Sequence, residues 1–348
     1  MTFNDVLEIK NGKNQKAVEN PKGTYPIYGS GGVMGYADDY ICKADTIVIG
    51  RKGSINNPIY VDEPFWNVDT AFGLEAKEDV LKPRYLYYFC KKFDFERLNK
   101  AVTIPSLTKS DLLKIEIILP DLDEQQDVID KLMKIEKIIQ YRKDELSSLD
   151  ELIKARFVEM FGDPIINSFG IDIKSMTDVC EIIDGDRGKN YPTADEFSDE
   201  GYCLFLNAKN VTSTGFNFDT CMFVTKEKDA VLRKGKLSRG DVVLTTRGTL
   251  GNLAFYTEDI PFEHVRINSG MVILRMKQDV VDEVYFIEQF KMQLADIREK
   301  IASGSAQPQL PISAMNKINI LTPNIEKQRQ FADFVRKVDK SKVVEIIN

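Results

Sequence analysis

Two short turns in this sequence combine a basic residue, a glycine and a hydroxyl residue directly after a run of aliphatic residues. The first turn holds Arg51, Lys52 and Ser54, and the second holds Arg247 and Thr249. Cationic and hydroxyl groups in such turns are suited to contact phosphate oxygens, and an arginine can also bind the edge of guanine with two hydrogen bonds. A solvated charge in a surface turn has the same composition, so both interpretations stay open.

Two longer polar segments, 100–109 and 300–309, are stronger candidates for the same chemistry. Each lies between an aromatic-rich segment and the last apolar run of its half of the chain. Loops of this kind commonly carry function, and a plain surface connection is the alternative. With weaker candidates at 187–190 and 209–210, they supply these further predicted contact residues: Thr103, Ser106, Thr108, Lys109, Arg187, Lys189, Asn190, Lys209, Asn210, Ser303, Ser305, Gln307 and Gln309.

The residue patterns that catalysis usually needs are scarce. His264 is the only histidine, and the five cysteines show no Cys-x-x-Cys spacing, which argues against a zinc site and a disulfide framework. The segment 57–60 (Asn-Pro-Ile-Tyr) is a near miss to the Asn-Pro-Pro-Tyr motif of adenine methyltransferases, and no glycine-rich cofactor loop accompanies it. We therefore predict no catalytic residue, no metal site and no bound cofactor, and we expect the chain not to be an enzyme.

The length and composition fit two domains of ordinary size. The chain has 348 residues, of which 43% are hydrophobic and 29% charged. It has neither a membrane-length apolar run nor an N-terminal signal sequence, so we expect a cytoplasmic protein without membrane contact. The formal charge of −7 divides into 0 for 1–120, −4 for 121–162, −5 for 163–324 and +2 for 325–348. Phosphate contacts must therefore come from local loops or from a partner.

The chain contains an internal duplication. Three similar segments occur in the same order in both halves, at offsets of 173, 195 and 203: 5–9 with 178–182, 46–55 with 241–250, and 114–120 with 317–323. The offsets grow only by insertion, which is typical of two copies of one domain. Short β-branched runs predict strands, and aromatic-rich segments at 83–90 and 283–290 predict helices on the sheet. The predicted domains are 1–120 and 163–324, each of mixed α and β structure.

A heptad pattern predicts a long spacer helix over 121–162. The segment has no proline or glycine before Gly162, and an acidic start at Asp121 follows Pro120. About 40 residues at 1.5 Å each would make a helix of roughly 60 Å, whose apolar seam requires a partner. The seam residues are Val128, Leu132, Ile135, Ile139, Leu146, Leu149, Ile153 and Phe157.

The same pattern restarts in a shorter helix predicted over 325–348. Phe331, Val335 and Val338 repeat the first three seam positions at an offset of 203. We expect the two helices to pair as an antiparallel coiled coil. Because the second helix spans only about 24 residues, we expect the seam around 146–160 to lack its cover and to bind another chain or pack on the adjoining domain.

The order of these parts resembles that of the specificity (S) subunits of type I restriction-modification enzymes. Four segments are similar to sequences that recur in that family. They are the Lys-x-Ile-x-Ile-x-x-Pro-type endings at 114–120 and 317–323 and the segments 25–29 and 49–54. The resemblance covers essentially the whole chain. It implies an α+β fold of two tandem target recognition domains, each followed by a long helix and related by a pseudo-two-fold axis.

The resemblance also implies a function. Each globular copy would recognise one half of a bipartite, asymmetric site in double-stranded DNA. The helices would hold two methyltransferase subunits, which bind S-adenosylmethionine, and motor or nuclease subunits could join. The short final helix departs from the family pattern and points to a second S-type chain as a further partner.

Two other functions stay open at this point. The acidic charge of 163–324 favours a protein-interaction or assembly module that does not recognise DNA itself. A self-contained enzyme is disfavoured by the scarcity of histidine, metal-ligand spacing and cofactor loops.

Overall fold

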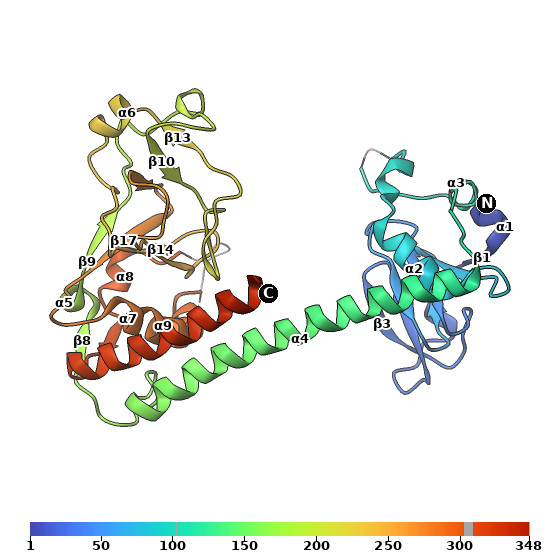
Figure 1. Cartoon of the computed structure of the whole chain (residues 1–348), viewed down its shortest axis with the longest axis horizontal. Helices are drawn as coiled ribbons and strands as arrows, with labels where there is room; N and C mark the ends of the chain where they lie inside the picture. The colour runs from blue at the N-terminus through green and yellow to red at the C-terminus, as the bar shows by residue number, and fades with distance from the viewer. Residues whose placement is uncertain (102, 303–308, 348) are drawn as a thin grey trace. The chain divides into compact units, whose positions relative to one another are not determined.

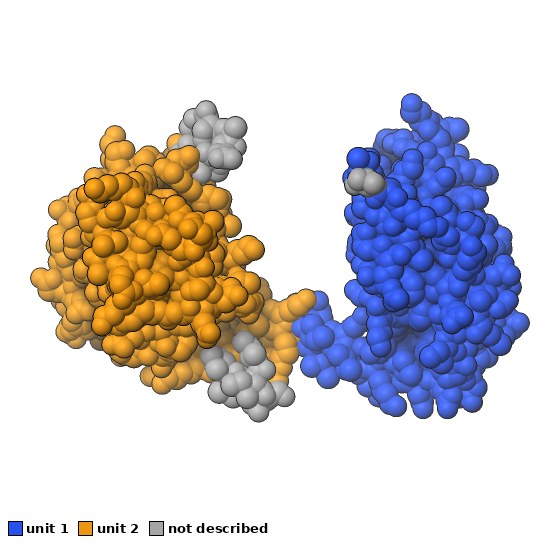
Figure 2. All heavy atoms as spheres, turned by 90° about the horizontal axis from the view of Figure 1, so that it is seen from above, with its two compact units in different colours: residues 1–141 blue, residues 142–348 orange. Residues whose placement is uncertain are grey.

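The computed structural model describes residues 1–101, 103–302 and 309–347. These residues form two compact units (Figures 1 and 2), unit 1 within 1–141 and unit 2 within 142–348. The boundary falls inside the long helix α4 (Leu122–Phe161), so the two parts of this helix belong to different units. No helix in the described part of the chain is long and apolar enough to cross a membrane.

Unit 1 is a mixed α/β body with two small sheets. Its elements before α4 are α1 (Phe3–Val6), β1 (Leu7–Asn11), η1 (Gln15–Ala17), β2 (Tyr25–Gly29), β3 (Gly32–Ala37), β4 (Thr46–Gly50), β5 (Ile59–Val61), β6 (Trp66–Asn67), β7 (Ala71–Ala76), α2 (Pro83–Lys92), η2 (Phe95–Leu98) and α3 (Lys109–Leu112). The four-stranded sheet has the order β1-β7-β4-β5, and the three-stranded sheet has the order β3-β2-β6.

Unit 2 contains more helices and strands than unit 1, and it also has a four-stranded and a three-stranded sheet. Its elements are β8 (Ile173–Ser175), α5 (Met176–Val179), β9 (Cys180–Asp184), η3 (Ala194–Glu196), β10 (Cys203–Leu206), β11 (Val211–Thr212), β12 (Gly215–Phe216), β13 (Phe223–Val224), α6 (Lys226–Val231), β14 (Val242–Thr245), β15 (Leu253–Phe255), β16 (Val265–Ile267), β17 (Met271–Met276), α7 (Glu283–Ala302), α8 (Ile312–Met315), β18 (Asn319–Leu321) and α9 (Ile325–Ile347). Its main sheets have the orders β15-β14-β17-β9 and β13-β10-β16.

The strand order and register of the two units agree. The antiparallel order β1-β7-β4-β5 corresponds to β9-β17-β14-β15. In unit 1 Ile47 lies opposite Leu74, and in unit 2 Val242 lies opposite Leu274. Val242 follows Ile47 by 195 residues, and Leu274 follows Leu74 by 200 residues, so the paired positions are equivalent. Each unit also has one parallel pair, β2 with β6 and β10 with β16. The predicted duplication and the α+β fold are confirmed.

Most of the extra length of unit 2 lies between β9 and β14. This stretch holds the β11–β12 hairpin and the helix α6, and the equivalent stretch between β1 and β4 has neither. The predicted insertion before the shared aliphatic strand is therefore confirmed.

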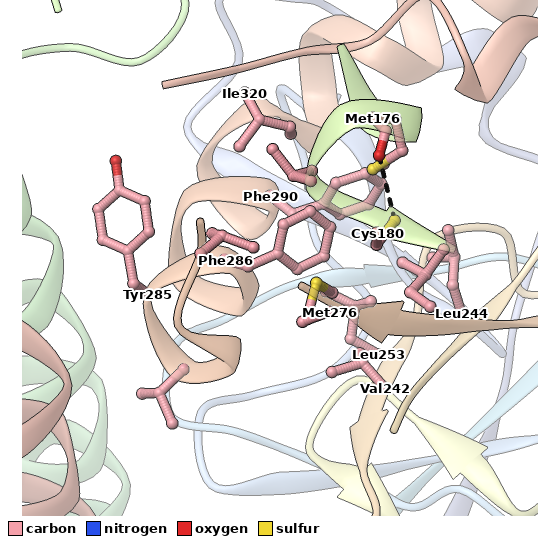
Figure 3. Packing of buried hydrophobic residues seen from close by; sticks show 14 of the residues in the cluster. Met176, Cys180, Val242, Leu244, Leu253, Met276, Tyr285, Phe286, Phe290 and Ile320 are labelled. Carbon is pink, nitrogen blue, oxygen red and sulfur yellow. Dashed lines mark hydrogen bonds between the residues drawn. The ribbon is translucent and has the colours of Figure 1, made fainter. Parts of the chain in front are cut away.

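Each unit has its own hydrophobic core beside its main sheet. In unit 1, Leu74 and Ile47 of the sheet pack with Leu86 of α2. In unit 2, Figure 3 shows Phe286 and Phe290 of α7 lying against residues of the sheet, and their rings stack with centroids 5.6 Å apart. The aromatic-rich helices predicted over 83–90 and 283–290 therefore cover the sheet as expected.

The predicted signals for the ends of α4 are also confirmed. The backbone N–H of Glu124 donates to Asp121 Oδ1 at 2.8 Å, which caps the first turn. Gly162 follows the last helical residue with a φ of +75°, a conformation that favours glycine and ends the helix.

The helix α9 runs antiparallel to the C-terminal part of α4. The rings of Phe331 and Phe157 have centroids 5.4 Å apart, and Lys342 Nζ contacts Asp150 Oδ1 at 2.7 Å. Higher residue numbers in α9 therefore lie beside lower numbers in α4 (Figure 1), which confirms the predicted antiparallel pairing.

The expectation that the seam around 146–160 lacks the cover of the second helix was wrong, and the alternative that this stretch packs on the adjoining domain is confirmed. Around 146–160, Ile153 and Phe157 are buried, so this part of the seam is covered and packs on unit 2. Exposed apolar residues instead lie earlier in α4, where Ile135 and Ile139 are about half exposed. The physical reason is the antiparallel direction, because a helix that starts at 325 first lies along the end of α4.

A buried glutamine joins each unit to its helix in the same way. In unit 1, Gln125 accepts from the N–H of Lys82 at 2.9 Å and donates to the carbonyls of Val80 and Pro120. At the offset of 203, Gln328 accepts from the N–H of Asp282 at 3.0 Å and donates to the carbonyls of Val280 and Pro323. Both side chains are fully buried, so the direction in which each helix leaves its unit is set by the same three bonds.

Candidate nucleic-acid interface

In unit 1, the turn after β4 lies beside the polar segment 100–109. The N–H of Arg51 donates to the carbonyl of Thr70 at 2.8 Å, and the carbonyl of Arg51 accepts from the N–H of Leu107 at 2.9 Å. Lys52 forms a β-bridge with Ser106. Two groups of predicted contact residues, far apart in the sequence, are thus brought together at one end of the main sheet.

The side chains of this turn are available to a ligand. Arg51, Lys52 and Ser54 are exposed, and the turn is held by Gly53, whose N–H donates to the carbonyl of Pro105 at 3.0 Å. Gly53 has a φ of +82°, which explains why a glycine follows the basic pair. The guanidinium of Arg51 lies 5.7 Å from the centre of the Phe72 ring, which limits the positions of this side chain.

Unit 2 repeats this arrangement after β14. The carbonyl of Thr246 accepts from the N–H of Leu310 at 3.0 Å, which is the counterpart of the bond between Arg51 and Leu107. Gly248 has a φ of +72°, and Arg247 and Thr249 on either side of it are exposed. The structure therefore places the predicted residues of this turn beside the segment that contains Gln309.

A cavity of about 180 Å³ at this edge of unit 2 brings three predicted residues together. Arg187, Arg247 and Gln309 all line it. Arg187 is held there because its Nη2 donates to Asp184 Oδ1 at 3.0 Å and to the carbonyl of Ser269 at 3.1 Å. Two guanidinium groups and an amide in one cavity are suited to a phosphate or to the edge of a base.

A buried carboxylate fixes the loop that carries Arg187. Asp186 accepts from the N–H groups of Gly188 and Arg233, both at 2.7 Å. The bond from Gly188 is the main reason that the pKa of Asp186 lies below its usual value, with the Arg233 charge and backbone assisting. The carboxylate therefore stays ionised near neutral pH and keeps this loop in place.

A second, larger depression of about 700 Å³ lies on the other side of the turn. It is lined by Lys209 from the loop before β11, by Thr249 and by Arg298 from α7. Sequence analysis missed Arg298, which donates to the carbonyl of Leu250. Its one available signal was its position just before the polar segment 300–309.

Several other predicted contact residues have internal hydrogen bonds. Thr108 caps α3, since its Oγ1 accepts from the N–H of Asp111 at 3.1 Å, and Lys109 Nζ donates to the carbonyl of Ile9 at 2.7 Å. Asn210 is fully buried, and Asn190 donates to the carbonyl of Val231. These bonds account for the residue types without a ligand, and a role in contacting DNA stays a prediction for them.

The remaining predicted residues are less constrained. Thr103 and Lys189 are exposed. Ser303, Ser305 and Gln307 lie outside the described residues.

No group of three or more His, Cys, Asp or Glu side chains that could hold a metal occurs among the described residues. Burial raises the pKa of Cys42, Cys180 and Cys203 to about 12, so these thiols stay protonated and unreactive at neutral pH.

The fold and these two equivalent polar edges define a tandem-module protein in which each module has an exposed polar edge at the end of its main sheet. The family model described as type I restriction modification DNA specificity domain matches residues 1–150 and 170–348. The chain therefore belongs to the family of type I restriction-modification specificity (S) subunits.

Relatives of known type agree with this assignment. A type I restriction enzyme specificity subunit from Methanocaldococcus jannaschii is 22% identical over 317 residues, covering 85% of this chain and 70% of that protein. The EcoBI specificity subunit from Escherichia coli is 20% identical over 347 residues, covering 92% of this chain and 70% of that protein. A putative type I specificity subunit from Mycoplasma pneumoniae is 28% identical over 142 residues, and the match spans 38% of this chain and 46% of that relative.

Solved structures show the same fold. The S subunit of a type I restriction-modification system from M. genitalium matches with a TM-score of 0.60 and 19% identity, covering 99% of this chain and 90% of that one. A chain from a structure of type I system assembly and conformational transition matches with a TM-score of 0.54 and 14% identity, at the same coverage.

Proposed function

We propose that this chain is the DNA-recognition subunit of a type I restriction-modification system and that it has no catalytic activity of its own. The two units would each contact one half of a bipartite, asymmetric site in double-stranded DNA. The observation that carries this proposal is the repeated edge, where a strand-end turn with exposed cations lies against a polar segment in both units.

The chemistry would be supplied by partners. Two methyltransferase subunits would bind S-adenosylmethionine and methylate adenine, and motor or nuclease subunits could join them. The helices α4 and α9 would hold these subunits.

The proposed spacing of the site follows from the helical spacer. α4 has 40 residues, which corresponds to a helix of about 60 Å, and one turn of B-DNA is about 34–36 Å. A spacer helix of this length would suit half-sites that lie one to two turns apart. Because the two units differ in their polar edges, the half-sites should differ in sequence.

The direct test is to combine the chain with its cognate methyltransferase subunit and to map methylated adenines on genomic DNA by single-molecule sequencing. The expected result is methylation at a split, non-palindromic motif. Methylation without any motif, or at one continuous motif, would contradict the proposal.

A protein-assembly module without DNA recognition is the second candidate. The net charge of −5 over 163–324 favours it, because acidic surfaces repel DNA. A mobility-shift assay at low salt separates the two candidates, since an assembly module would add no affinity to that of the methyltransferase subunit alone.

A further inference from the structure

The hairpin of β2 and β3 brings Ser30, at its tip, to the turn after β4. A Cβ added to Gly50 would lie 2.9 Å from the Cβ of Ser30, and one added to Gly53 would lie 3.7 Å from Ser30 Oγ. The tip therefore lies directly against the turn that carries the exposed Arg51 and Lys52. The sequence patterns predicted no contact residue in this hairpin, so it adds a third segment to the polar edge of unit 1.

Unit 2 brings the corresponding loop to the same place. The strands β2 and β10 are equivalent, because β2 pairs in parallel with β6 and β10 pairs in parallel with β16. The loop after β10 contains Lys209, which lines the same depression as Thr249 of the turn after β14. In both units, the loop that follows the parallel strand therefore lies beside the strand-end turn. The side chains that this loop carries differ between the two units.

Gly31, at the tip of the hairpin, is a glycine that the fold does not require. No atom of the described residues lies within 4 Å of the point where its Cβ would stand, and its φ lies outside the left-handed range that favours glycine. Gly29 differs, since a Cβ there would lie 2.6 Å from Met34 Sδ. An open glycine at an exposed tip leaves room for a ligand to approach the main chain closely.

Two apolar side chains next to the tip are exposed. Val33 is 53% exposed and Met34 is 62% exposed. The sulfur of Met34 lies against Gly29, so this side chain crosses the hairpin close to its tip. Double-stranded DNA offers partners for both kinds of group, because phosphates attract the cations of Arg51 and Lys52 and the thymine methyl group accepts apolar contacts in the major groove. A two-stranded β-ribbon also fits the width of that groove.

We propose that the β2–β3 hairpin of unit 1 enters the major groove and that Met34 contacts a thymine methyl group there. The cations of the adjacent turn would hold phosphates, Gly31 would let the main chain come close to the bases, and Met34 would select an A·T pair. Unit 2 would read its half-site differently, because its corresponding loop carries Lys209. This inference rests on the proposed function, since it assigns a base contact within the half-site that unit 1 would recognise.

The experiment uses the full chain assembled with its methyltransferase subunit and DNA duplexes that carry the motif found by methylation mapping. In each test duplex, one thymine of the motif is replaced by deoxyuridine, which removes only the methyl group. For one thymine of one half-site, the parent complex should bind the substituted duplex about fourfold more weakly, as expected for one buried methyl group. The Met34→Ala complex should bind the two duplexes of that pair equally.

Two further variants separate a base contact from an effect on folding. Gly31→Ala should leave the unfolding midpoint unchanged or raised, because its φ and the open space accept an alanine, and it should weaken the binding of every motif duplex. Ile118→Ala is the matched control, because Ile118 is an apolar residue of unit 1 that is 87% exposed and lies outside the hairpin and the turn. Its complex should keep the affinity of the parent and the parent's response to deoxyuridine.

Three outcomes would overturn the proposal. The first is a parent complex that binds equally well with and without each thymine methyl group. The second is a Met34→Ala complex that keeps the parent's response to every deoxyuridine. The third is a Gly31→Ala complex that binds the motif as tightly as the parent does.

These outcomes can be told apart from a failure of the proposed function. A complex that methylates a split motif and gives any of the three outcomes rejects the hairpin contact alone. Methylation without any motif rejects the proposed function, and it rejects the hairpin contact as well, because unit 1 would then recognise no half-site.

Discussion

Unit 1 and unit 2 share strand order, register and a helix junction, and they differ in what covers the helix beside them. In unit 2, the heptad seam packs around Phe157, which is fully buried. In unit 1, the equivalent helix face leaves Ile118 and Val128 open. The comparison teaches that duplication preserved the backbone pairing and the junction, whereas side-chain burial depends on which segment lies against each copy.

The largest expected effect is a loss of stability in unit 2, where the seam of α4 is buried. Phe157→Ala removes a ring that contacts three other aromatic rings, and it should lower the free energy of unfolding of unit 2 by about 3–5 kcal/mol. In unit 1, Leu132→Ala on the N-terminal part of α4 affects a half-buried residue of the same seam and should cost about 1 kcal/mol. Urea unfolding monitored by circular dichroism measures both, and equal losses would contradict the comparison.

A somewhat smaller loss of stability tests the buried glutamine junction that the two units share. Gln125→Ala and Gln328→Ala each leave buried backbone groups without a partner, so each should cost about 3 kcal/mol. Gln126→Ala is a suitable control, because Gln126 bonds only to the exposed Asp130 among the bonds described. Losses for the two buried glutamines that differ by more than about 1 kcal/mol would break the equivalence of the two junctions.

The next prediction compares the polar edges. Arg247→Ala and Lys52→Ala remove equivalent exposed cations, and each should weaken DNA binding of the assembled complex by about 1–2 kcal/mol and reduce the salt slope by about one. Binding measured at several salt concentrations checks both. Lys109→Ala tests the predicted contact of a lysine whose ammonium group donates to the carbonyl of Ile9, since an unchanged salt slope would reject that contact.

The smallest expected effect concerns pH. Hydrogen bonds from Thr2 lower the pKa of Asp5, and hydrogen bonds from Ser175 lower the pKa of Asp178. A lowered pKa in the folded state means that each capping box adds stability above the usual aspartate pKa of about 3.9, and loses it as the pH falls through the lowered value.

The variants Asp5→Asn and Asp178→Asn should therefore reduce the dependence of the free energy of unfolding on pH between about pH 5 and pH 2. Near neutral pH, the slope of this dependence should change little. Unfolding midpoints across this range measure the effect. A change in pH dependence for only one of the two variants would show that the two capping boxes are not equivalent.

Much of the fold could be predicted from local sequence patterns. The recurrence of 46–55 as 241–250 placed the central strands and the turns after them in both units, because strand and turn preferences act over a few residues. The heptad spacing and Gly162 predicted α4 and its end for the same reason. The candidate site was partly predicted, since the cations after both strands were found where expected and Arg298 was missed.

The rest depended on contacts between distant residues. Nothing local distinguishes Lys109, which donates to a carbonyl 100 residues away, from a lysine that is free to bind phosphate. Arg187 and Arg247 lie 60 residues apart, and only the pairing of β9, β17 and β14 brings them to one cavity.

The sequence by itself determined that the chain has two copies of one mixed domain and a long spacer helix, because repeats and hydrophobic periods are properties of neighbouring residues. The tertiary structure decided which part of the spacer seam is covered and which cations share a surface. Both depend on the antiparallel direction of α9 and on the order of strands in each sheet, and burial of a side chain follows from what packs against it rather than from its own residue type.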